Sequence, residues 1–308
     1  MLGKDLVSIA DLSAEDIAQL LDLAADLKAH RPHRERPLDG KILALLFQKP
    51  SLRTRVSFEV GIRHLGGSAL YLSDQEVGLG KRESIADASR VLSRMVDGIV
   101  ARTFLHQDVV ELAHYATVPV VNGLSDDEHP CQILADLLTI REHRGRLAGL
   151  RLAWIGDANN VVTSLLLAAP RVGLNLRIAS PAGYEPDARL LNSAADEAAD
   201  AGVELEIVND PRVAVRDADV VYTDTWYSMG REAERETRRP LFRPYQVNAA
   251  LMAEAAPGAL AMHCLPAHRG EEITDDVLDS PTSVVLDQAE NRVHAQKAVL
   301  VRLMARGA

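Results

Sequence analysis

The sequence predicts an α/β protein of two similar-sized domains, each a mainly parallel β-sheet flanked by helices. Apolar runs of strand length alternate with helical patterns along nearly the whole chain, which is typical of βαβ units. The alternation restarts after a polar, glycine-containing stretch at 143–149. The chain has 308 residues, more than one hydrophobic core usually supports. We therefore expect domains at 1–145 and 146–308.

The elements of the first half follow from local patterns. Ser13 and Asp16 resemble a capping box, and the apolar residues after them recur at helical spacing up to Leu27. The segment 41–47 is almost entirely apolar, which predicts a buried strand. The remaining predicted elements are helices at 53–65, 84–96, 109–116 and 130–143, and strands at 69–72, 98–102 and 118–121.

The second half repeats this alternation. The predicted strands are 151–155, 176–179, 203–208, 219–222 and 259–262. The predicted helices are 161–172, 189–201 and 290–304. Neither half contains a repeat of solenoid period or a low-complexity tract.

Composition excludes several classes of protein. The chain has 34 basic and 44 acidic residues, a net charge of −10, which argues against a general nucleic-acid binder. Its two cysteines, Cys131 and Cys264, cannot form a disulfide framework for a chain of this length. The first 20 residues carry acids and lack the apolar core of a secretion signal. No apolar run approaches the roughly 18 residues that span a bilayer. We expect a cytoplasmic protein with reduced thiols and no membrane or nucleic-acid partner.

Open α/β sheets bind ligands beyond the carboxyl ends of their strands, so the segments after each strand are informative. The segment 48–55 follows the strand ending at Phe47 and begins a helix. It brings two hydroxyls (Ser51, Thr54) and two guanidinium groups (Arg53, Arg55) to a helix N-terminus. This combination predicts phosphate binding, with Arg55 more structural than Arg53. The plainer alternative is an N-cap with solvated arginines.

Two further strand exits carry hydrogen-bonding side chains. Arg102 ends one predicted strand, although an arginine there is often simply at the surface. His129 and Gln132 flank a helix N-terminus at a spacing that places them on one face, where both could bind a carbonyl or an anion. Cys131 between them is interpreted as a small packed residue.

The second half has its own polar strand exits. The segment 156–160 lacks the three glycines of a dinucleotide turn, so a nicotinamide cofactor is not expected. The segment 224–230 places a carboxylate, a hydroxyl and a glycine after another strand. Asp224 could bind an ammonium group, and an ordinary turn is the alternative.

The segment 262–268 contains one cysteine and two histidines, which invites a zinc interpretation. His263 and Cys264 are adjacent, however, and adjacent residues of a strand face opposite sides. Zinc also needs three or four ligands at set spacings, so we expect no metal. A cysteine-nucleophile hydrolase would need an orienting base, and none is evident.

Together these segments resemble the aspartate/ornithine carbamoyltransferase family, and within it the branch that uses ornithine. The resemblance covers nearly the whole chain. It rests on the segments 51–55, 129–132, 159–160, 224–230, 263–266 and 289–292, and on Arg102. It implies transfer of a carbamoyl group from carbamoyl phosphate to the δ-amine of L-ornithine without a cofactor. It also implies a last helix, at about 288–306, that packs back on the first domain.

The resemblance assigns roles by position. The residues it implies for carbamoyl phosphate are Ser51, Leu52, Arg53, Thr54, Gln75, Arg102, His129, Gln132, Cys264, Leu265 and Arg292. Those it implies for ornithine are Asn160, Asp224, Ser228 and Met229. Arg102, His129, Asp224 and Cys264 would act at the reacting centre. The family forms trimers, which implies a homotrimer or a higher assembly of trimers, with Gln75 supplied by a neighbouring subunit.

One position departs from the family pattern. Most members have threonine where this chain has Leu52, whose side chain cannot donate a hydrogen bond. Its backbone N–H still can. Relatives that use acetylornithine can share this leucine, so another amine such as acetylornithine or putrescine remains an alternative substrate. The Ser-Met-Gly run at 228–230 favours free ornithine. A non-catalytic homologue that acts as a binding or scaffold protein is the alternative outside the enzymes.

Overall fold

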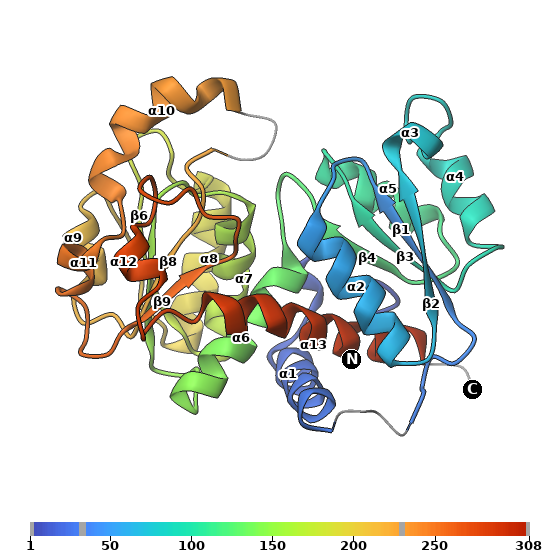
Figure 1. Cartoon of the computed structure of the whole chain (residues 1–308), viewed down its shortest axis with the longest axis horizontal. Coiled ribbons are helices and arrows are strands. Elements are labelled where there is room, and N and C mark those ends of the chain that lie inside the picture. Colours follow the sequence, from blue (N-terminus) through green and yellow to red (C-terminus); the bar gives the residue numbers. More distant parts are fainter. Residues whose placement is uncertain (1–2, 31–34, 228–231, 306–308) are drawn as a thin grey trace. The chain divides into compact units, whose positions relative to one another are not determined.

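The structure is a computed structural model that describes residues 3–30, 35–227 and 232–305. Its contacts divide the chain into two compact units. Unit 1 contains Met1–Leu138 and Glu290–Ala308, and unit 2 contains Thr139–Ala289. Figure 1 shows each unit as a sheet of strands with helices around it. The predicted α/β class with parallel sheets is confirmed. The domain limits 1–145 and 146–308 stay a prediction.

Unit 1 is built on a four-stranded parallel sheet in the order β2-β1-β3-β4. The strands are β1 (Ile42–Phe47), β2 (Ser68–Ser73), β3 (Gly98–Arg102) and β4 (Val120–Leu124). The helices are α1 (Ala14–Ala29), α2 (Leu52–His64), α3 (Asp74–Val77), α4 (Ile85–Leu92), α5 (His106–Tyr115) and the first part of α6 (Pro130–Arg144), with η1 (Ile9–Asp11) a short 3-10 helix. The capping box predicted at Ser13 and Asp16 is confirmed at the start of α1.

The central strands β1 (after Ile42) and β3 are buried on both faces, as continuous apolar strands require. Side chains of α4 and α5 pack on one face, where Ile85 and Val109 join Leu46 and Ile99 in a buried cluster. Helix α2 packs closely on α13 (Val285–Met304): a Cβ atom at Gly61 would lie 3.4 Å from Cγ of Lys297. The last helix begins five residues earlier than the predicted 290, and its residues from Glu290 onward belong to unit 1.

Unit 2 is built on a five-stranded parallel sheet in the order β7-β6-β5-β8-β9. The strands are β5 (Arg151–Ile155), β6 (Asn175–Ala179), β7 (Leu205–Val208), β8 (Val220–Thr223) and β9 (Leu260–His263). The helices are α7 (Asn160–Val172), α8 (Ala188–Ala201), α9 (Pro211–Val215), α10 (Arg235–Phe242), α11 (Ala249–Met252) and α12 (Asp275–Leu278), with 3-10 helices η2 (Glu232–Glu234) and η3 (Arg243–Tyr245). Pattern reasoning missed α3 and α9 to α12, because elements of four to eight residues are too short to establish a period.

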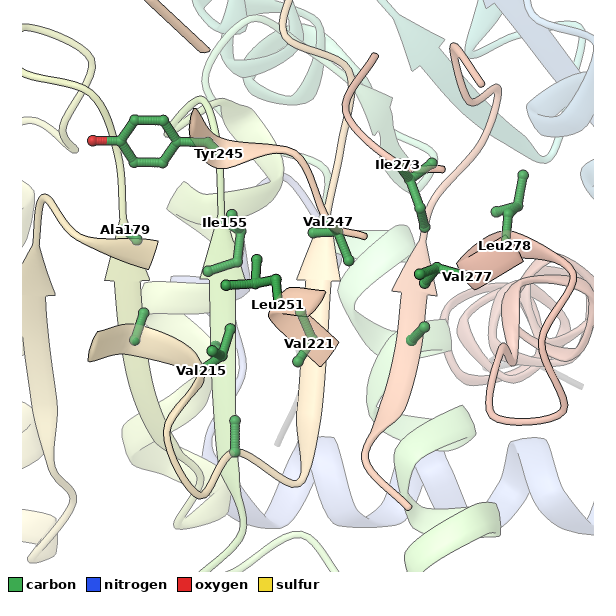
Figure 2. Close-up of a cluster of buried hydrophobic side chains, with 14 of the residues drawn as sticks. Ile155, Ala179, Val215, Val221, Tyr245, Val247, Leu251, Ile273, Val277 and Leu278 are labelled. Atoms are coloured by element: carbon green, nitrogen blue, oxygen red, sulfur yellow. The ribbon is translucent and has the colours of Figure 1, made fainter. Parts of the chain in front are cut away.

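A buried apolar cluster forms one side of the unit 2 sheet. Figure 2 shows Ile155 and Val221 of the central strands packed against Val215, Leu251 and other side chains of the surrounding helices and loops. This packing fixes the positions of β5, β8 and β9, whose last residues carry the polar segments described below. Within the described residues, no helix is long and apolar enough to cross a membrane.

Candidate active site

The first polar cluster lies where the strand order of unit 1 reverses direction. In the order β2-β1-β3-β4, the chain leaves β1 toward one side and β3 toward the other, so β1 and β3 flank the switch point at which α/β sheets bind ligands. Phe47 pairs with Arg102 at the carboxyl ends of these strands. The phosphate-type segment at 48–55 and Arg102 are therefore neighbours, although some 50 residues of sequence separate them.

Helix α2 begins with a side-chain cap. Ser51 is the N-cap, and its Oγ accepts from the Thr54 N–H at 3.3 Å and donates to Thr54 Oγ1 at 3.0 Å. The first amides of the helix, including that of Leu52, have no intrahelical acceptor. Arg292 of α13 donates from Nη2 to Thr54 Oγ1 at 2.7 Å. Two segments 238 residues apart thus meet at a helix N-terminus, which favours negative charge.

Arg102, His129 and Arg292 form a buried group that we call the cationic cluster. Their relative exposures are 6%, 4% and 3%. Burial lowers the pKa of His129 well below its ordinary value of 6.5, and the positive charges of Arg292 and Arg102 lower it further. The imidazole is therefore neutral at pH 7 and can donate one hydrogen bond without adding charge. Two guanidinium groups and a neutral imidazole suit a ligand that is anionic and carries a carbonyl oxygen.

The helix that follows His129 contributes two further side chains. Gln132 is buried, and its Nε2 donates to Asp136 at 2.8 Å while its Oε1 has no hydrogen-bond partner among the described residues. Cys131 is fully buried and lies 3.7 Å from the carbonyl oxygen of Asn122. Burial raises the pKa of the Cys131 thiol to about 12, so it stays protonated and acts as a packed side chain, as predicted.

The other predicted phosphate residues lie on the surface of unit 1. Arg53 is half-buried and makes no hydrogen bond or ion pair with the described residues, whereas Arg55 pairs with Glu59 at 2.9 Å and stacks on Tyr71. Leu52 is 75% exposed, and Gln75 is exposed on α3. The side chains of Leu52 and Gln75 are therefore exposed rather than packed against the cationic cluster.

The contacts that fix the residue before His129 were not predicted from the sequence. The carboxylate of Glu128 is 3% exposed and accepts from the Ser8 hydroxyl and from the Ile9 N–H at 3.0 Å. The turn is closed by Ser125, whose N–H donates to the Glu128 carbonyl oxygen at 3.0 Å. The N-terminal segment thereby fixes the residue that precedes His129. Glu128 could not be singled out from the sequence, because its partner Ser8 lies 120 residues away and no local pattern links the two.

The second polar cluster lies at the switch point of unit 2, between β5 and β8. The last residues of β5, β8 and β9 pair with one another, Ile155 with Thr223 and Thr223 with His263. Asn159 caps α7 just after β5, and its Nδ2 donates to the Asp224 carboxylate at 2.6 Å. Asn160, the predicted ornithine ligand, is the next residue and is half-buried.

Cys264 lies beside Asp224, and the structure corrects one step of the sequence argument. Ligand atoms of Asp224, His263 and Cys264 all lie within 4.8 Å of one another. His263 and Cys264 were expected to face opposite sides, but β9 ends at His263, so strand alternation no longer applies to Cys264. Leu265 follows with a φ of 58°, a strained left-handed conformation of the kind that gathers at functional sites.

The geometry also bears on metal binding and thiol chemistry. His263 Nδ1 accepts the Leu265 N–H at 2.9 Å, and its Nε2 lies 3.1 Å from the Glu272 carboxylate, with His263 and Glu272 both fully buried. Both ring nitrogens of His263 are thus engaged. A metal at this cluster, or a proton transfer from Cys264 to His263, would have to break one of these bonds. The remaining predicted ornithine residues, Ser228 and Met229, lie outside the described residues.

The sequence and the fold are similar to those of known carbamoyltransferases. A family profile described as the carbamoyl-P binding domain of aspartate/ornithine carbamoyltransferase matches residues 4–142, and the Asp/Orn binding domain profile matches 148–303. The anabolic ornithine carbamoyltransferase of Pyrococcus furiosus is 55% identical over 99% of this chain and 97% of its own length. The ornithine carbamoyltransferase of Anoxybacillus flavithermus is 55% identical over 98% of this chain and 97% of its own. The solved P. furiosus structure superimposes with a TM-score of 0.96 at 54% identity, covering 99% of this chain and 98% of that one.

Proposed function

Because the chain belongs to the aspartate/ornithine carbamoyltransferase family, we propose that it transfers the carbamoyl group of carbamoyl phosphate to the δ-amine of L-ornithine, giving L-citrulline and phosphate. The observation that carries the proposal is the cationic cluster at the switch point of unit 1, because buried guanidinium groups beside a helix N-terminus suit an acyl phosphate. We propose a biosynthetic role, in arginine formation, because the name of the P. furiosus relative includes the word anabolic.

Carbamoyl phosphate would be held by residues from both chain segments of unit 1, the N-terminal part and the last helix. The first amides and hydroxyls of α2 (Ser51, Leu52, Arg53 and Thr54) would bind the phosphate oxygens together with Arg292, which already contacts Thr54. The exposed side chain of Leu52 leaves its backbone N–H as the group that binds. Arg102, the neutral His129 and Gln132 would bind the carbamoyl end.

Ornithine would be held by unit 2. The Asp224 carboxylate, oriented by Asn159, would bind an ammonium group, with Asn160, Ser228 and Met229 holding the rest of the amino acid. Cys264 and Leu265 would line the reacting centre. The proximity of Asp224 and Cys264 supports ornithine, because this substrate has a second amine that needs a binding group.

The chemistry needs position and charge stabilisation rather than a cofactor, since carbamoyl phosphate is already activated. The amine nitrogen forms a bond to the carbonyl carbon, and the bond from that carbon to the phosphate oxygen breaks. Arg102 and His129 would donate to the carbonyl oxygen as it gains negative charge, which is typically worth about 10²–10³ in rate for each donor. The departing phosphate can accept the proton that the amine releases.

The amine must first be neutral. Its ordinary pKa is about 10.4, so deprotonation at pH 7 costs about 4.6 kcal/mol. Asp224 and Cys264 would hold and orient the amine, and desolvation in the occupied site would ease this loss because it disfavours the charged form. The expected result is that kcat/KM for ornithine rises with pH across the neutral range. A flat profile between pH 6 and 9, measured with saturating carbamoyl phosphate, would contradict this role.

The assembly and location belong to the same proposal. We propose a homotrimer, or a higher assembly of trimers, in which Gln75 on the exposed helix α3 reaches the site of a neighbouring subunit. The proposed location is the cytoplasm, with no nucleic-acid or membrane partner. Sedimentation of the purified chain tests the assembly, and a monomer with full activity would contradict it.

The deciding experiment supplies labelled carbamoyl phosphate with ornithine, acetylornithine, putrescine or aspartate, and measures the carbamoylated product and phosphate. Citrulline should form with a kcat/KM far above that of every other product. Faster carbamoylation of acetylornithine or putrescine would assign a different amine. Absence of any product, with carbamoyl phosphate still bound, would indicate a non-catalytic homologue.

A further inference from the structure

We infer that Gln288 is a positioning residue that holds together the ends of the two strands carrying Asp224 and Cys264. This inference rests on the proposed function. Gln288 lies in the first turn of α13 and is fully buried. Its Oε1 accepts the backbone N–H of His263 at 3.0 Å, and its Nε2 donates to the Tyr222 hydroxyl at 2.9 Å. One amide therefore bonds to β9 and to a side chain of β8.

The first bond completes an unpaired strand edge. Strand β9 is at the edge of its sheet, so the backbone groups on its outer side need partners. The outward N–H of Ala261 donates to the Thr282 carbonyl oxygen at 3.0 Å, and the Val284 N–H donates to the Ala261 carbonyl oxygen at 3.0 Å. Two residues later, at His263, the Gln288 side chain takes the place of backbone. It thus secures the last residue of β9, directly before Cys264.

The second bond reaches the neighbouring strand. Tyr222 is fully buried, its ring packs on Trp154 at 4.8 Å, and Asp224 follows two residues later. Because β8 and β9 are parallel and paired up to Thr223 and His263, a shift of either end would change the separation of Asp224 and Cys264. The bridge through Gln288 opposes that shift at the point where the backbone ladder ends.

A purely structural glutamine would also be buried and bonded, so the test must separate positioning from stability. Gln288→Leu removes both bonds at similar volume. We expect kcat/KM for ornithine to fall about 10- to 100-fold, because a small displacement of the groups that hold a substrate can cost that much in rate, while KM for carbamoyl phosphate changes less than about twofold. Gln288→Glu can accept from the His263 N–H and from the Tyr222 hydroxyl, and should recover most of the ornithine kcat/KM.

Tyr245→Phe is the matched control in the same unit. The Tyr245 hydroxyl is bonded to the carbonyl oxygens of Ser180 and Asn209, away from β8 and β9, so its loss should lower the melting temperature without changing the ornithine kinetics. Equal kinetic losses in Gln288→Leu and Tyr245→Phe would overturn the inference. A parallel rise in KM for carbamoyl phosphate would also overturn it, because that would indicate displacement of α13 and its Arg292.

Tyr222→Phe provides a second route if Gln288→Leu does not fold. It keeps the ring and removes one bond, so the ornithine kcat/KM should fall about threefold to tenfold. An unchanged ornithine kcat/KM in Tyr222→Phe would overturn the inference. Failure of the proposed function is a separate result, since it would appear as absent citrulline formation in the wild-type chain.

Discussion

The two polar clusters differ in charge and in burial. In unit 1, Arg102, His129 and Arg292 are all less than 10% exposed, and the positive charges are concentrated at a helix N-terminus. In unit 2, Asp224 and Cys264 are only half-buried. A compact dianion can satisfy several buried cations at once, whereas a long amino-acid chain needs a more open site. The comparison predicts that mutations in the two clusters affect different substrates.

The largest expected effect comes from the cationic cluster. Arg102→Met should lower kcat/KM by about 10²- to 10³-fold, because it removes a donor to the developing oxyanion. Carbamoyl phosphate should no longer raise the melting temperature of the variant. Arg90→Met is the control: Arg90 pairs with Asp87 on the surface of unit 1, and its loss should leave the kinetics within about twofold. Full activity of Arg102→Met would contradict the role of the cationic cluster in binding carbamoyl phosphate.

Substitution in unit 2 should give the complementary result. Asp224→Asn removes the charge that would bind an ammonium group, so KM for ornithine should rise about 10- to 100-fold. The stabilisation by carbamoyl phosphate, measured as a shift in melting temperature, should be unchanged. If Asp224→Asn abolished that shift, the two clusters would not be separate sites for separate substrates.

The buried histidine gives unit 1 a pH dependence. Burial and two nearby arginines lower the pKa of His129 in the folded protein, while in the unfolded chain it stays near 6.5. The unfolded chain therefore takes up a proton that the folded protein does not. The stability contributed by the neutral imidazole is complete above pH 6.5 and is lost as the pH falls. Between pH 6 and 5 the wild type should lose up to about 1.4 kcal/mol of unfolding free energy more than His129→Gln.

Urea unfolding of both proteins at several pH values measures this difference. Saturating phosphate should reduce it, because the anion offsets the field of the arginines and raises the pKa of His129. Parallel stability curves for the two proteins would show that the imidazole titrates normally in the folded state.

The smallest expected effect concerns the N-terminal support of His129. Ser8→Ala removes one bond to the Glu128 carboxylate, at a cost of about 1 kcal/mol in unfolding free energy. KM for carbamoyl phosphate should rise a few-fold and KM for ornithine should not change. Ser84→Ala, which removes a cap of α4 on the same unit, is the control for a stability loss alone. A change in ornithine KM would place the effect outside the turn at Glu128.

The sequence by itself determined the local chemistry of this protein. Alternating patterns predicted most of the strands and longer helices, and the polar segments after Phe47, Ile155 and His263 were recognisable because strand ends, caps and turns depend on residues a few positions apart. The expectation for Cys264 was wrong because it extended strand alternation past His263, where β9 ends.

Only the tertiary structure decided which of these segments meet. Strand order placed Arg102 beside the helix that follows β1 and Asp224 beside the helix that follows β5. The contacts of Arg292 with Thr54, Glu128 with Ser8 and Gln288 with Tyr222 span 238, 120 and 66 residues. No local pattern encodes such pairs, because they arise from the way whole helices and sheets pack to bury their apolar faces.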